Sequence, residues 1–161
     1  MIADIEVEHE HIMSESLVDI PGCNQVPFGL IFRLDFGSDV SVWTSRPETS
    51  FGDVALCVHP DDKRYRRFIG KSFLHPITQK YIPMVSDSSV DREFGSGIIK
   101  LTPTVSKLDF EIAQRNGITE LPQFLTETGL IDFPHLPKYH VTFFIFLFIG
   151  KTTISGEKDA Y

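Results

Sequence analysis

Two short segments concentrate the side chains best suited to binding a polar ligand. Residues 44–49 (Thr-Ser-Arg-Pro-Glu-Thr) place hydroxyl, guanidinium and carboxylate groups around a proline. Pro47 fixes its own φ and favours an extended backbone at Arg46, so we expect a rigid polar loop that leaves a strand. Residues 94–103 (Phe-Gly-Ser-Gly-Ile-Ile-Lys-Leu-Thr-Pro) have a glycine pair followed by β-branched residues. An extended backbone there would point Lys100 and Thr102 to the same side.

The elements that must position these segments are mostly strands. Alternating apolar residues across 28–35, a turn at residues 37–39 and a second alternation across 40–44 predict a β-hairpin. Further strands are expected at 54–58 and 98–102. Residues 106–116 have the clearest helical pattern, with Leu108 and Ile112 on the buried face and Gly117 as its end. Many short strands with few helices predict an α+β, mainly β fold, as a small closed or nearly closed β-barrel with peripheral helices.

Composition and charge narrow the classes of function. The 161 residues, 42% of them hydrophobic, suit one globular core. A net charge of −7 argues against a chain that binds nucleic acid over its whole surface. Contact with RNA would need a local basic patch, and the candidate is residues 63–71 (Lys-Arg-Tyr-Arg-Arg-Phe-Ile-Gly-Lys), with a solvated charged turn as the alternative.

The cysteines and the first residues bear on the cellular compartment. Cys23 and Cys57 are far apart, which favours buried thiols in a reducing compartment over a disulfide or a zinc site, so no metal or cofactor is expected. Residues 1–6 are acidic and lack the basic stretch of a secretory signal or the arginines of a transit peptide. We therefore expect a cytoplasmic protein, with a mitochondrial location as the alternative and no membrane as a partner.

Further motifs follow the two segments in a consistent order. They are Gly-Asp-Val-Ala at 52–55, Val-His-Pro-Asp-Asp at 58–62 and Asp-Phe-Glu-Ile at 109–112. Together, across residues 3–131, the motifs resemble the editing domain (connective peptide 1) of valyl-tRNA synthetases, a class I aminoacyl-tRNA synthetase family. That family's signatures for amino-acid activation, His-Ile-Gly-His and Lys-Met-Ser-Lys-Ser, do not occur in the sequence. The chain by itself is therefore not expected to aminoacylate tRNA.

The resemblance implies a hydrolytic function. Valine and threonine are nearly isosteric, and a hydrophobic pocket separates them only about a hundred-fold, a value established for valyl-tRNA synthetases themselves. A second, polar site would hydrolyse the ester of threonyl-tRNA(Val). The implied partners are the 3′ acceptor end of tRNA(Val) carrying threonine and the remainder of a synthetase.

The resemblance also implies roles for eight residues. Asp109 would bind the substrate ammonium, Lys100 and Thr102 would read the side chain, and Phe94 would form a wall of the pocket. Arg46 and Thr49 would hold the terminal adenosine or the ester. Thr44 and Ser45 would line the water site. Asp109, Thr44, Ser45 and Thr49 are thus the candidate catalytic residues, and Arg46, Phe94, Lys100 and Thr102 are the candidate substrate-binding residues.

Each of these roles has a simpler structural alternative. Ser106 and Asp109 have the spacing of a helix-capping pair. Lys100 and Thr102 would be ordinary residues on the surface of a strand, where the lysine is solvated and the threonine favours extended backbone. Arg46 and Glu48 would simply pair with each other at the surface, which contributes little stability.

The sequence departs from the family's pattern next to the candidate site. The family typically has Pro-Ala-His-Asp where this chain has Pro-Thr-Val-Ser at 103–106, so Val105 and Ser106 replace an imidazole and a carboxylate. This leaves a second function open. The chain would then be an editing-domain fold without catalysis that binds a tRNA acceptor end or a protein, or a truncated inactive product.

The resemblance also suggests a division of the chain. Residues 1–25 would lead into the domain, residues 26–131 would form the editing domain, and residues 132–161 would be an atypical C-terminal tail. The tail contains an apolar run at 141–149 that is about half the length of a membrane-spanning helix.

Overall fold

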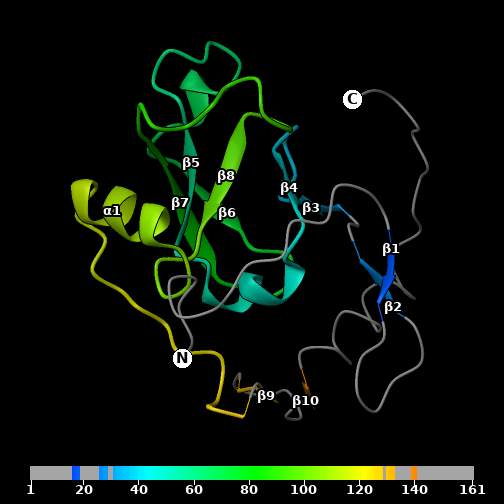
Figure 1. Ribbon diagram of the computed structural model, residues 1–161. Helices are drawn as coiled ribbons and strands as arrows, with labels where there is room; N and C mark the ends of the chain where they lie inside the picture. Colours follow the sequence, from blue (N-terminus) through cyan, green and yellow to red (C-terminus); the bar gives the residue numbers. More distant parts are fainter. Residues whose placement is uncertain (1–15, 19–25, 29–30, 129, 133–138, 141–161) are drawn as a thin grey trace.

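The computed structural model describes residues 16–18, 26–28, 31–128, 130–132 and 139–140, and the statements below concern those residues (Figure 1). Cys23, the apolar run at 141–149 and most of the predicted leading segment and tail lie outside them. The division of the chain into three parts therefore stays a prediction. No helix among the described residues is long and apolar enough to cross a membrane.

A four-stranded sheet forms the centre of the domain. Its strands are β5 (Ala55–Val58), β6 (Ser72–Leu74), β7 (Tyr81–Ser86) and β8 (Ile98–Leu101), in the order β6-β7-β5-β8. Strands β5 and β7 are parallel, and the other two pairs are antiparallel. All four residues of β5 are buried, which explains its uninterrupted apolar sequence. The strands predicted at 54–58 and 98–102 are confirmed as β5 and β8.

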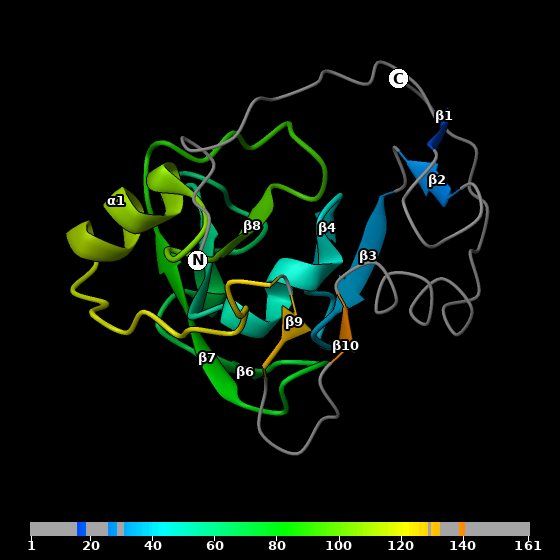
Figure 2. The same ribbon diagram turned by 60° about the horizontal axis from the view of Figure 1, so that its bottom comes forward.

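Alternate residues of the central strands face two different cores. Leu56 and Val58 pack in a cluster with the hairpin of β3 (Phe32–Asp35) and β4 (Ser41–Thr44). Ala55 and Cys57 pack in a second cluster with α1 (Lys107–Arg115). Figures 1 and 2 show the hairpin and α1 on opposite sides of the sheet. Burial raises the pKa of the Cys57 thiol to about 12, so this cysteine is an inert core residue, as its sequence context predicts.

The predicted hairpin is confirmed. It consists of β3 (Phe32–Asp35) and β4 (Ser41–Thr44), and the turn between them places Ser38 and Asp39 at positive φ. The strand starts later than the alternation from residue 28 indicated, because residue 28 ends β2 (Val26–Phe28). That strand pairs with β1 (Ser16–Val18) instead.

The predicted helix is also confirmed, although one face was assigned wrongly. Ser106 caps α1 by accepting a hydrogen bond from the Asp109 N–H, and Gly117 follows its end at φ 71°. Ile112 is fully buried, but Leu108 is 47% exposed. In the first turn Asp109, and not Leu108, faces the sheet, because its carboxylate accepts a hydrogen bond from the Thr102 N–H of the segment after β8.

The mainly β, α+β class is confirmed, whereas closure into a barrel is not shown. The hairpin and the central sheet are separate hydrogen-bonded units, and β6 and β8 end the central sheet among the described strands. Two 3₁₀ helices, η2 (Pro47–Gly52) and η3 (Arg66–Phe68), and the short pair β9 (Leu130–Ile131) and β10 (Tyr139–His140) complete the described elements. Strand periodicity indicates how many strands exist but not which strand edges pair. The prediction of a closed barrel therefore went beyond what the structure shows.

The two faces of α1 give a stability prediction. Ile112→Ala should destabilise the fold by roughly 2–5 kcal/mol, because it removes a fully buried side chain from the core between α1 and the sheet. Leu108→Ala is the matched control and should change the free energy of unfolding by no more than about 0.5 kcal/mol. Urea unfolding followed by circular dichroism measures both, and an equal cost at the two positions would contradict this placement of the helix.

Candidate active site

One cavity brings together every residue that the sequence singled out for chemistry. It has a volume of about 300 Å³ and lies where the hairpin, β8, the loop before β8 and the start of α1 meet. Its lining includes all eight candidates, namely Thr44, Ser45, Arg46, Thr49, Phe94, Lys100, Thr102 and Asp109. These residues come from four separate parts of the chain, so their convergence is a property of the tertiary structure. Their assigned roles remain predictions.

The polar loop is ordered by its own side chains. The Thr44 hydroxyl oxygen accepts a hydrogen bond from the Arg46 N–H at 3.1 Å, and the Thr49 hydroxyl donates to the Arg46 carbonyl at 2.8 Å. From Pro47 the chain turns into η2, whose six residues are all buried. The Arg46 guanidinium pairs with Glu48 at 3.2 Å, so the pairing considered as the simpler alternative does occur.

Lys100 is directed into the protein and not into solvent. Its ammonium donates to the Thr49 hydroxyl oxygen at 2.6 Å, to the Thr102 hydroxyl oxygen at 2.9 Å and to Asp53 Oδ1 at 2.9 Å. Its side chain is only 9% exposed. The ammonium group has three N–H donors, and these three acceptors use all of them. The solvated-lysine alternative is therefore wrong, and Lys100 acts on the cavity by orienting two hydroxyl groups.

Asp53 is the residue at this site that sequence reasoning missed. Its buried carboxylate accepts hydrogen bonds from Lys100 and from the Thr102 hydroxyl, the latter at 2.6 Å, through Oδ1. Oδ2 lies 3.2 Å from Nε2 of the fully buried His75. Burial alone raises the pKa of Asp53, but the Lys100 charge and the hydrogen bonds from His75, Thr102 and Lys100 outweigh it. They hold the pKa below its ordinary value of 3.8.

The tautomer of His75 follows from its other nitrogen. Nδ1 accepts hydrogen bonds from the Ile77 and Thr78 N–H groups, each at 3.1 Å, so Nε2 carries the proton and donates a hydrogen bond to Asp53. The sequence did contain a signal for Asp53, since a Gly-Asp pair stands directly before a buried apolar strand. A Cβ on Gly52 would overlap the Phe124 ring and lie 3.0 Å from Thr102 Cγ2, so glycine permits the close approach that brings Asp53 to Thr102.

Asp109 places a carboxylate in the cavity wall. It accepts a hydrogen bond from the Thr102 N–H at 2.8 Å, while its own N–H donates to the Ser106 hydroxyl. Only half of the predicted capping pair therefore forms, because the carboxylate bonds to Thr102 and not to the Ser106 backbone. Burial raises the pKa of Asp109, and the Thr102 hydrogen bond and the Lys100 charge offset part of this effect. The result is a partly desolvated anion that lies within reach of a cationic ligand.

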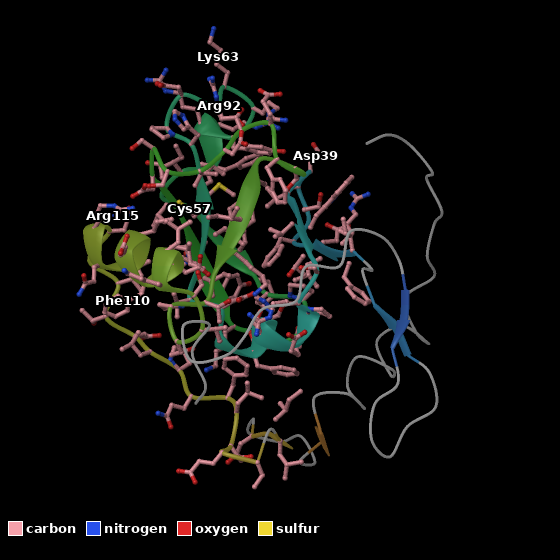
Figure 3. All side chains as sticks on the ribbon, viewed as in Figure 1. Asp39, Cys57, Lys63, Arg92, Phe110 and Arg115 are labelled. Carbon is pink, nitrogen blue, oxygen red and sulfur yellow. The ribbon has the colours of Figure 1, made fainter. Side chains whose placement is uncertain are left out.

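The loop that carries Phe94 is held by the predicted basic segment. Arg64 pairs with the buried Asp62 and donates to the Arg92 carbonyl at 2.7 Å, and the Tyr65 hydroxyl donates to the Ser96 carbonyl at 2.8 Å. Phe68 is buried, with the Arg67 guanidinium 4.6 Å from its ring centre. Figure 3 shows Lys63 and Arg92 projecting at the same end of the domain. The aromatic residues of segment 63–71 thus pack inward or tether a loop, and this arrangement gives them no place as base-stacking groups.

The two positions that depart from the family's pattern also lie at the cavity. Val105 and Ser106 both line it; Val105 is buried, and Ser106 caps α1. The residues that line this cavity include no histidine. No group of three histidine, cysteine, aspartate or glutamate side chains within the described part of the chain is placed to hold a metal ion.

The described residues form a mainly β domain with a cavity lined by hydroxyl groups and the Asp109 carboxylate. Comparison with known proteins then places the chain in the valine–tRNA ligase family. It is 40% identical to the mitochondrial valine–tRNA ligase of Rattus norvegicus over 74% of the chain, and 38% identical to valine–tRNA ligase of Homo sapiens over 83%. It is 38% identical to the mitochondrial valine–tRNA ligase of Saccharomyces cerevisiae over 81% of the chain.

The chain spans only 11–12% of the length of these relatives. No family profile matches it. Among solved structures, it has a TM-score of 0.39 and 14% identity to "The crystal structure of GlLeuRS-CP1", covering 63% of this chain and 59% of that one. A likeness at that level does not define the fold.

The buried carboxylate gives a second prediction. Asp53→Asn should destabilise the fold by roughly 3–5 kcal/mol, because it leaves the Lys100 ammonium buried without its counter-charge. Asp39→Asn changes the same group at an exposed turn position and serves as the matched control, with no more than about 0.5 kcal/mol expected. Thermal unfolding at pH 7 measures both variants, and comparable melting temperatures for Asp53→Asn and the unmodified chain would contradict this role.

The same pair of variants has a defined pH dependence. Because the folded pKa of Asp53 lies below 3.8, its contribution to stability is complete above that pH and is lost as the pH falls through the folded value. The difference in melting temperature between the unmodified chain and Asp53→Asn should therefore be constant near neutrality and shrink in acid below pH 3.8. A difference in melting temperature that grows on acidification would contradict this role of Asp53.

Proposed function

We propose that this chain performs post-transfer editing within a valyl-tRNA synthetase, by hydrolysing the ester of threonyl-tRNA(Val). The observation that carries the proposal is the position of Asp109 and of the Thr49 and Thr102 hydroxyl groups around one cavity of about 300 Å³. An amino acid esterified to RNA presents an ammonium group, a side chain and an ester carbonyl close together. The cavity offers groups of complementary chemistry to the first two.

The ammonium group of the substrate is assigned to Asp109. Its carboxylate is half-buried and accepts a strong hydrogen bond from the Thr102 N–H. Charge-assisted hydrogen bonds in such partly desolvated positions are about twice as strong as neutral ones. A free amino group therefore orients the substrate, and blocking that group should prevent productive binding.

Recognition of the substrate hydroxyl is assigned to Thr49 and Thr102. Thr49 donates to the Arg46 carbonyl and accepts from Lys100, while Thr102 donates to Asp53 and accepts from Lys100. A hydroxyl oxygen has two lone pairs, so each threonine keeps one acceptor site for a donor in the cavity. The hydroxyl of a bound threonine can donate there and the methyl group of valine cannot, which favours threonine over valine.

Hydrolysis itself requires a held water molecule. Thr44 and Ser45 contribute hydroxyl groups at the cavity wall, where they can bind a water next to the ester. The water oxygen adds to the ester carbonyl carbon, the bond from that carbon to the ribose oxygen breaks, and a proton from the water ends on the ribose oxygen. The products are threonine and tRNA with a free terminal hydroxyl group.

A second function has its own support. Val105 and Ser106 stand at the cavity where the family's pattern has histidine and aspartate, and a valine can neither bind a water nor transfer a proton. On this alternative the domain binds an acceptor end or a protein without hydrolysing it. Editing and acceptor-end binding share the partners proposed above, namely tRNA(Val) and the remainder of a synthetase, whereas a protein-binding domain would not need the tRNA. We assign the function to the cytoplasm, with mitochondria as the alternative, since the relatives include mitochondrial enzymes.

Asp109 provides the direct test of the proposed chemistry. Asp109→Asn keeps the size of the side chain and an acceptor for the Thr102 N–H, but it removes the charge that pairs with the substrate ammonium. Loss of one charged hydrogen bond of about 1.5–3 kcal/mol should lower kcat/KM for threonyl-tRNA(Val) deacylation about 10- to 150-fold. Ser106→Ala is the control. Loss of the helix cap should lower the free energy of unfolding by about 1 kcal/mol, and with it the melting temperature, with little change in the deacylation rate.

The readout is release of threonine from threonyl-tRNA(Val), with valyl-tRNA(Val) as the substrate control. Because the pKa of Asp109 is raised, the acidic limb of the rate profile should lie above pH 3.8 and vanish in Asp109→Asn. Unchanged deacylation in that variant would remove Asp109 from the site.

The two departures from the family's pattern allow a gain-of-function test. If the unmodified chain shows no deacylation above background, the double variant Val105→His, Ser106→Asp should restore it, since both positions line the cavity. A binding-only domain would instead retain affinity for tRNA(Val) and remain inactive after this change. The melting temperature of the double variant should be measured alongside, because Val105 is buried.

A further inference from the structure

His59 and His75 each stand directly before a proline, and each holds a turn through Nδ1. At His59, Nδ1 accepts a hydrogen bond from the Asp61 N–H at 3.1 Å. At His75, Nδ1 accepts from two N–H groups of the turn between β6 and β7. The two turns differ in the other ring nitrogen, because Nε2 of His75 also contacts the Asp53 carboxylate at 3.2 Å. That contact is therefore separate from the holding of the turn.

The His75 ring is held firmly in the protein interior. It is fully buried, and the Phe36 ring packs against it edge to face, with 5.3 Å between the ring centres. The His75 N–H donates to the Lys80 carbonyl at 2.8 Å, and the His75 carbonyl accepts from the Gln79 N–H at 3.0 Å. With its backbone and Nδ1 both engaged, the ring cannot turn without breaking these bonds. The Nε2–H group therefore has a fixed direction towards Asp53.

The plane of the Asp53 carboxylate depends on its hydrogen-bond partners. The χ2 torsion of aspartate is broad, so the side chain does not fix this plane by itself. Oδ1 accepts from the Lys100 ammonium and the Thr102 hydroxyl, and within the described part of the chain the donor to Oδ2 is His75. Lys100 and Thr102 line the cavity, whereas Asp53 and His75 lie behind them. The direction of the Nε2–H group thus reaches the cavity through one shared carboxylate.

We propose that His75 is a positioning residue for the recognition of threonine, because its Nε2–H group fixes the Asp53 carboxylate that orients the Thr102 hydroxyl. This inference rests on the proposed function and extends it to a residue outside the cavity. Without the His75 donor, Oδ2 would be a buried acceptor that lacks a partner, and rotation of the carboxylate towards Lys100 and Thr102 would relieve this. The Thr102 hydroxyl would then lose its fixed direction, and a substrate hydroxyl would lose part of its advantage over a methyl group.

Two substitutions separate this role from the holding of the turn. His75→Asn places an amide oxygen near the position of Nδ1, so it keeps an acceptor for the turn but has no donor that reaches Asp53. His75→Gln is longer and places an amide N–H group near the position of Nε2, so it restores the donor to Asp53 and gives up the acceptor for the turn.

The readout is the ratio of kcat/KM for threonyl-tRNA(Val) to kcat/KM for valyl-tRNA(Val), which does not depend on how much of each protein is folded. The ratio should fall about 2- to 12-fold in His75→Asn, the equivalent of one hydrogen bond, and recover in His75→Gln. His59→Asn is the matched control and should leave the ratio unchanged. An unchanged ratio in His75→Asn, or an equal fall in both His75 variants, would overturn the proposal and leave His75 as a residue of the turn.

A double-mutant cycle tests the same connection without any substrate. His75 and Lys100 share Asp53 as a partner, so the shifts in melting temperature caused by His75→Asn and Lys100→Met should not add up in the double variant. The shifts caused by His59→Asn and Lys100→Met should add up. Additive shifts for His75 and Lys100 would overturn the proposal while leaving the editing function intact. Coupled shifts in a chain that hydrolyses neither ester would reject the proposed function and support the connection from His75 through Asp53.

Discussion

The buried carboxylate of Asp53 is the interaction on which the candidate site depends. It is the common acceptor for the Lys100 ammonium, the Thr102 hydroxyl and the His75 ring. A charge at full burial is tolerated only when it is paired and fully hydrogen-bonded, and here each bond that satisfies it also fixes a neighbouring group. These bonds fix the orientation of Lys100 and Thr102 at the cavity.

The central sheet separates Lys100 from the apolar core that packs against α1. Lys100 lies opposite Leu56 in the pairing of β5 and β8, on the face that the hairpin covers, whereas Leu101 and Ala55 face α1. Because successive residues of a strand point to opposite faces, β8 supplies polar groups to the cavity and apolar groups to the helix core from adjacent positions. Strand β8 ends the central sheet among the described strands, which places Lys100 and Thr102 at the sheet's edge, beside the cavity.

The site also combines stability and function in the same residues. Asp109 lies in the first turn of α1 and bonds to Thr102, while the Asp62–Arg64 pair tethers the loop that presents Phe94. Substitutions at such positions alter folding and ligand geometry together. The positions where the chain departs from its family, Val105 and Ser106, keep their structural duties as a buried residue and a helix cap.

The sequence by itself determined the features that depend on neighbours along the chain. The hairpin turn at 37–39, the cap at Ser106, the helix end at Gly117 and the family relationship all follow from local patterns or ordered motifs, and all of them are found. The eight candidate residues were also identified in advance. That they line a single cavity could be observed only in the folded chain.

The tertiary structure decided what depends on partners distant in the sequence. It showed that Asp53 belongs to the site, that Lys100 points inward, that Leu108 is exposed and that the described sheets remain open. From the sequence alone, Lys100 has the pattern of a solvated strand residue. Its burial becomes evident only when the folded chain places Thr49, Asp53 and Thr102 around its ammonium group. The physical reason is that periodicity and capping act over a few residues, whereas burial and the pairing of charges are set by contacts between segments that only folding brings together.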